Sequence, residues 1–143
     1  MSNINTVKFY RRAGGNYSEA VRRLKSESLI ERLLKMLMSD NSVESLIAAI
    51  NANDAGKAFY SVHTLKGVAL NLGLDSLADV CSQMTEILRG HASIPPEAKQ
   101  YSAAVANEFL RITEILAALY EENGTDKAEN EAYSVGNSQQ MHL

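Results

Sequence analysis

Apolar residues recur every three or four positions along most of the chain, which is the spacing of amphipathic helices. A short first helix is expected over residues 6–12, before Gly14 and Gly15 interrupt the pattern. A longer periodic stretch covers residues 17–37, and we expect a bend in it near Lys25. The first third of the chain is therefore predicted to be helical but broken.

Four further segments follow with the same periodicity. We expect helices over residues 43–50, 54–72 and 75–88, separated by short polar or glycine-containing turns. The last helix should begin at the Pro95-Pro96 pair, since proline fits the first turn of a helix, and should reach Tyr120. No segment shows the alternation typical of a strand.

These elements predict an all-α fold, namely an antiparallel four-helix bundle with additional N-terminal helical segments. Three regions are expected along the chain. Residues 1–16 form an N-terminal segment with a short helix, residues 17–120 form the bundle, and residues 121–143 form a disordered tail. The tail is predicted because the sequence there is polar and loses its periodicity.

Composition narrows the possible functions. The 143 residues suffice for one domain, and a net charge of −3 with a pI near 5.6 does not support nucleic-acid binding. We interpret the basic cluster at residues 11–25 as a solvated helix face. No stretch approaches the roughly 20 apolar residues of a membrane span. We expect a cytoplasmic monomer, in which the single cysteine, Cys81, is a small buried residue.

The helix at 54–72 carries the most informative residues. At about 100° per residue, His63 lies opposite the core face and is flanked by Lys66 and Gly67. A glycine inside an exposed helix costs about 1 kcal/mol relative to alanine, so it needs a reason. Close helix packing would require an inward position, whereas an outward one leaves room for a partner. A nitrogen nucleophile beside a cation and a cleared position suits acceptance of a phosphoryl group from another protein.

Three large side chains extend this face, and we predict that they form a docking patch: Phe59, Tyr60 and Leu70. The alternative for Phe59 and Leu70 is that the N-terminal helical segment covers them. A metal site is not expected, because no second ligand lies one turn from His63. The other histidines fall in a predicted loop and in the predicted tail.

The run His63-Thr64-Leu65-Lys66-Gly67, continued through Val68–Leu74 and Leu77–Cys81, resembles the signature of histidine-containing phosphotransfer (HPt) domains. The resemblance implies that His63 accepts the phosphoryl group, that Lys66 helps to hold its oxygens and that Gly67 leaves room for the partner. Val68 departs from the small residue common there and should change packing only. Gln83 would match a glutamine found in some members if its face were right.

The function implied is that of a phosphocarrier, which exchanges a phosphoryl group between His63 and aspartates of response-regulator receiver domains. A hybrid sensor histidine kinase is a further candidate partner. No cofactor is expected, since Mg²⁺ should come with the receiver, and the lack of a nucleotide-binding loop argues against autokinase activity. The alternatives are a non-catalytic helical adaptor using the same face, and the phosphoacceptor part of a larger histidine kinase.

Overall fold

The chain is helical in every regular element that the structure, a computed structural model, describes, as the sequence predicts. The described residues are 4–140, with side chains described as far as residue 123. The helices in chain order are α1 Thr6–Ala13, α2 Tyr17–Leu24, α3 Glu27–Leu37, α4 Ser42–Asn51, α5 Ala55–Asn71, α6 Asp75–Leu88 and α7 Ala98–Gln140.

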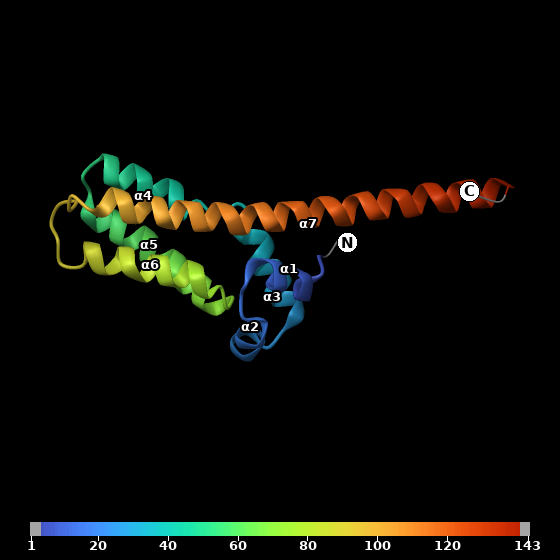
Figure 1. The fold of residues 1–143 in the computed structure, drawn as a ribbon, viewed down its shortest axis with the longest axis horizontal. Coiled ribbons are helices and arrows are strands. Elements are labelled where there is room, and N and C mark those ends of the chain that lie inside the picture. The colour runs from blue at the N-terminus through green and yellow to red at the C-terminus, as the bar shows by residue number, and fades with distance from the viewer. Residues whose placement is uncertain (1–3, 141–143) are drawn as a thin grey trace.

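Helices α4 to α7 form the predicted antiparallel bundle. α5 packs between α4 and α6, and α7 closes the bundle by contacting both α4 and α6 (Figure 1). Each helix contributes an apolar stripe to the centre, where side chains are excluded from water and stabilise the fold through burial. Fully buried examples from the four helices are Leu46, Leu65, Met84 and Ile112.

The N-terminal helices α1 to α3 pack on the bundle beside the α5–α6 turn. α1 packs on α7, and α2 packs on α3 and α5. The predicted bend is a true break, because Lys25 adopts a left-handed φ of 60° and ends α2, while the Ser26 side chain caps α3. Phe9 and Tyr10 of α1 are buried in the common core. These additions are therefore part of the fold.

Two local devices fix the ends of α5. At its start, the Asp54 carboxylate caps the helix by accepting a 3.0 Å hydrogen bond from the Lys57 backbone N–H. At its end, Gly73 turns the chain with a φ of 64°, a conformation that favours glycine. The carbonyl of Gly73 also accepts a 2.7 Å hydrogen bond from the Asn16 N–H. The loop before α2 is thus attached to the α5–α6 turn.

The last helix differs from the prediction at its end. α7 continues beyond Tyr120 to Gln140, so the predicted tail begins with helical backbone (Figure 1). No proline follows Pro96 to stop the helix, and Glu122 is held by ion pairs to Lys8 and Arg12 of α1. Residues 141–143 of the predicted tail lie outside the described residues. The domain limit placed at residue 120 stays a prediction.

Candidate functional site

His63 lies on the solvent face of α5, as predicted from the helical phase. Its side chain is exposed, while the opposite face of the same helix forms the centre of the bundle. Four residues of that inner face are at most 1% exposed, namely Ala58, Val62, Leu65 and Ala69. Because α5 is packed on both sides, it presents His63 on a rigid support.

Gly67 faces open solvent one turn beyond His63. A Cβ atom built at this position would meet no atom within 4 Å, so the glycine makes no close helix-to-helix contact. The inward alternative for Gly67 is therefore excluded. The surface next to His63 is clear of side chains at this point, and a partner could approach it closely.

The His63 ring is nearly parallel to the ring of Phe59 and offset from it. The ring centroids are 5.7 Å apart and the planes differ by 12°, which is an offset stack. Phe59 is half-buried and packs against the core. On the α6 side, the Arg89 guanidinium carbon lies 5.5 Å from the Phe59 centroid. The sequence reasoning missed Arg89, because its place depends on how α6 is aligned with α5.

The charges near His63 come from α5 and α6. Arg89 forms a 3.0 Å ion pair with Glu86, and this hydrogen-bonded guanidinium lowers the pKa of the Glu86 carboxyl, with a smaller contribution from Lys66. Lys66 is half-buried one turn from His63, and it forms no ion pair with a described side chain. Lys66 thus offers a cation that no described carboxylate neutralises directly.

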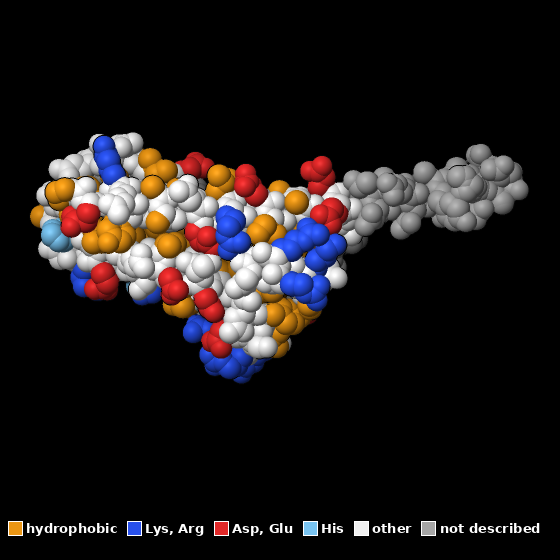
Figure 2. All heavy atoms as spheres, in the orientation of Figure 1, with side chains coloured by type: hydrophobic (Ala, Val, Ile, Leu, Met, Phe, Trp, Pro, Cys, Tyr) orange, Lys and Arg blue, Asp and Glu red, His pale blue; other side chains and the backbone are white. Residues whose placement is uncertain are grey.

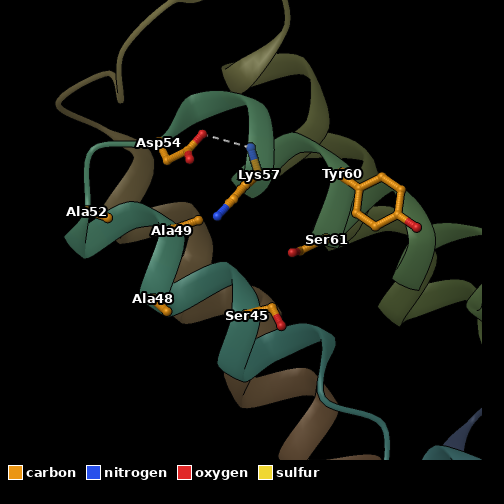
Figure 3. A pocket seen from close by; sticks show the side chains of 8 residues that line it. All are labelled: Ser45, Ala48, Ala49, Ala52, Asp54, Lys57, Tyr60 and Ser61. Carbon is orange, nitrogen blue, oxygen red and sulfur yellow. Dashed lines mark hydrogen bonds between the residues drawn. The ribbon is translucent and has the colours of Figure 1, made fainter.

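The predicted docking residues lie around His63 in different environments. Tyr60 is 72% exposed and Leu70 is 37% exposed, so the N-terminal helices do not cover Leu70. Tyr60 borders a groove of about 520 Å³ between α4 and α5, into which the Lys57 side chain extends (Figure 3). Phe59 instead lines a smaller pocket of about 350 Å³ beside the end of α6. The two hollows lie on different sides of α5.

Four other residues named in the sequence analysis are not among the residues described around His63. Gln83 is exposed on α6, and its role at the site stays a prediction. Val68 is half-buried against the core, in keeping with its expected packing role. His91 lies in the loop after α6 and borders the Phe59 pocket, while His142 lies outside the described residues. Among the described residues, no cluster of side chains could hold a metal ion, and no helix could span a membrane.

The basic cluster of the N-terminal helices is a separate feature. Figure 2 shows Lys and Arg side chains gathered over α1 and α2. Arg22 and Arg23 pair with Glu19, and Arg12 pairs with Glu122. These partly neutralised, exposed charges support the interpretation of the cluster as a solvated helix face.

Comparisons with known proteins identify the family and the fold. A family model described as the Hpt domain matches residues 28–122. Among solved structures, the HPt domain of a sensor hybrid histidine kinase from Shewanella matches with a TM-score of 0.63 and 17% sequence identity. That match covers 76% of this chain and 96% of the other, and shows a shared fold. No curated protein matches. Since the family model spans more than half of the chain, this protein belongs to the Hpt domain family, whose members act in phosphorelay signalling.

Proposed function

We propose that the protein is a phosphocarrier of a two-component phosphorelay, with His63 as the residue that receives and donates the phosphoryl group. The observation that carries the proposal is the arrangement around His63. Its imidazole is exposed on a rigid helix, and Lys66 lies one turn away. The surface over Gly67 is open, since a Cβ atom placed there would meet no atom within 4 Å. These are the conditions for docking another protein's phosphorylated residue.

The reaction assigned to His63 is a direct transfer from an aspartyl phosphate. The lone pair of the unprotonated ring nitrogen forms the N–P bond as the P–O bond to the aspartate breaks, and that electron pair leaves with the carboxylate. The proton on the other ring nitrogen can then pass to water. Such transfers proceed through a loose transition state, so positioning and charge stabilisation dominate. Lys66 supplies a positive charge for the phosphoryl oxygens.

The partner proposed is a response-regulator receiver domain. Tyr60 and Leu70 provide exposed apolar surface on the His63 side of the bundle, and Phe59 provides a half-buried ring beside the histidine. Apolar patches of this kind commonly mark interaction sites. Mg²⁺ is expected on the receiver, next to its aspartate. A hybrid sensor histidine kinase is proposed as the upstream source of the phosphoryl group. In this scheme the kinase reacts with ATP, and the present protein only carries the phosphoryl group and has no autokinase activity.

Incubation with phosphorylated receiver domains tests the proposal. Acid-labile phosphate should appear on His63 and be absent from the variant His63→Gln, whereas His91→Gln should label as the wild type does. ATP alone should not label the protein. Label that persists in a folded His63→Gln variant would overturn the site. A helical adaptor, the rival function, would keep its partner binding and its cellular output in His63→Gln.

A further inference from the structure

The ring of Phe59 stacks beside the imidazole of His63. The two rings are 5.7 Å apart and nearly parallel, at 12°. Among the described residues, none forms a hydrogen bond with a ring nitrogen of His63. No hydrogen bond to a described residue orients the imidazole, whereas the stack on Phe59 does restrict it.

The direction of this contact matters for the chemistry. The reactive lone pair of an imidazole lies in the plane of the ring, so a phosphorus atom must approach the ring edge. A neighbour on the ring face restricts rotation and leaves the edge free. Because reacting groups must be aligned before the barrier is crossed, restricting the ring before the partner arrives lowers the entropic cost of transfer.

Phe59 is itself held from the adjacent helix. The guanidinium carbon of Arg89 lies 5.5 Å from its ring centroid, a distance at which the positive charge is attracted by the ring. Arg89 in turn donates hydrogen bonds of 3.1 and 3.0 Å to Glu86 one turn earlier on α6. The contacts thus run from a carboxylate on α6, through a guanidinium and an aromatic ring, to the imidazole on α5.

We infer that Phe59 is a positioning residue for His63: its ring, held by Arg89, fixes the plane in which the imidazole nitrogens are offered to a phosphoryl donor. This inference rests on the proposed function and adds a role that docking alone would not give. A docking residue sets how tightly the receiver binds, whereas a positioning residue sets the rate within the complex.

The experiment compares variants of the 143-residue chain. Phe59→Leu keeps an apolar side chain but removes the ring, Phe59→Tyr keeps the ring, and Arg89→Gln removes the charge above it. Arg22→Gln is the matched control, since Arg22 forms a similar exposed pair with Glu19 on α2. Circular dichroism and thermal unfolding first establish that each variant is folded. Transfer from a phosphorylated receiver is then measured over a range of receiver concentrations.

The expected result is a lower maximal rate at an unchanged half-saturating concentration. Phe59→Leu should lose about tenfold in maximal rate, Arg89→Gln should lose less, and Phe59→Tyr and Arg22→Gln should stay near the wild type. A rise in half-saturating concentration alone would overturn the inference and assign Phe59 to docking. Failure of Phe59→Tyr to retain the rate, in a folded protein, would also contradict it.

Proton NMR of the His63 ring separates this inference from the proposed function. A ring stacked on Phe59 should show upfield-shifted imidazole signals, which move downfield in Phe59→Leu and remain in Phe59→Tyr. Unchanged signals in Phe59→Leu would show that no stack holds the ring. If the signals shift as expected but no receiver phosphorylates the wild type, the stack exists and it is the proposed function that fails.

Discussion

The phenolic hydroxyl of Tyr10 donates a 2.6 Å hydrogen bond to the backbone carbonyl of Leu72. Tyr10 lies in α1 and is only 3% exposed, while Leu72 is the C-terminal cap of α5, the helix that carries His63. Carbonyl groups at a helix end lack partners within the helix, and the hydroxyl supplies one. Burial raises the pKa of Tyr10, which keeps the hydroxyl protonated as a donor. The first helix is thereby tied to the end of the site helix.

Replacing Tyr10 with phenylalanine should destabilise the protein. The ring would still fill its buried site, but the Leu72 carbonyl would lose its donor in a place with little access to water. We expect the free energy of unfolding to fall by about 1–2 kcal/mol. Urea unfolding measures this, with Tyr60→Phe as the control, because Tyr60 is 72% exposed. Equal stability of the two variants would show that the buried hydrogen bond adds nothing.

Gly73→Ala should be more damaging than Gly90→Ala, although both glycines have positive φ. A Cβ at Gly73 would lie 2.2 Å from the backbone oxygen of Asn16, whereas one at Gly90 would meet nothing within 4 Å. Gly90→Ala should cost roughly 1–2 kcal/mol from the backbone conformation alone. Gly73→Ala should cost a further 1–3 kcal/mol or so, because the loop before α2 must move. Thermal unfolding of both variants gives the comparison.

Substitutions at Gly67 should separate stability from transfer. Gly67→Ala should stabilise α5 by up to about 1 kcal/mol, since alanine is the better helix former and the added Cβ meets nothing within 4 Å. Gly67→Gln should also fold, yet its side chain would stand beside His63 and slow transfer from a receiver sharply. Unfolding curves and transfer rates are measured on the same samples. Full transfer by a folded Gly67→Gln protein would argue against close approach of a partner there.

Lys66→Ala should slow phosphoryl transfer by at least about tenfold, because it removes the cation one turn from His63. The fold should survive, since the inner face of α5 is unchanged. Lys99→Ala removes an exposed lysine from α7 and serves as the control. Single-turnover transfer kinetics test this expectation. Matching rates for the two variants would mean that Lys66 does not stabilise the transferred group.

Cys81 should be unreactive in the folded protein. Its side chain is fully buried, and burial raises the pKa of the thiol from 9.0 to about 12, with Lys66 opposing this weakly. The protonated form is favoured by folding, so the associated stability is present below pH 9.0 and is lost as pH rises toward about 12. At pH 8 a thiol reagent should label the protein only as fast as it unfolds. Rapid labelling under native conditions would contradict this burial.

Much of the site was predictable because its residues share one helix. The phase of α5 follows from its own apolar stripe, and that phase alone places His63 and Gly67 on the outside. The break at Lys25 was also visible as an interruption of the pattern. Its left-handed φ of 60° could not be read from the sequence, since lysine has no preference for that conformation.

Contacts between helices were harder to predict. The place of Arg89 over Phe59 depends on the alignment of α6 with α5, which apolar spacing does not fix to one residue. The hydrogen bond from Tyr10 to Leu72 joins residues far apart in sequence, and no local sequence pattern predicts it. The continuation of α7 past Tyr120 was missed because polarity was taken to end the helix. The helical backbone instead runs through Gly124 and Gly136 to Gln140, since no proline follows Pro96 and an established helix propagates more easily than a new one starts.

The attachment of the N-terminal segment to the α5–α6 turn has a kinetic consequence. Helices α4, α5 and α6 are neighbours in sequence, so their contacts close short loops, whereas the contacts of Tyr10 and Asn16 close long ones. Local contacts of the first kind form early, and interactions absent from the transition state act mainly on the unfolding rate. We therefore expect the N-terminal helices to prolong the lifetime of the folded His63 surface more than they speed its formation.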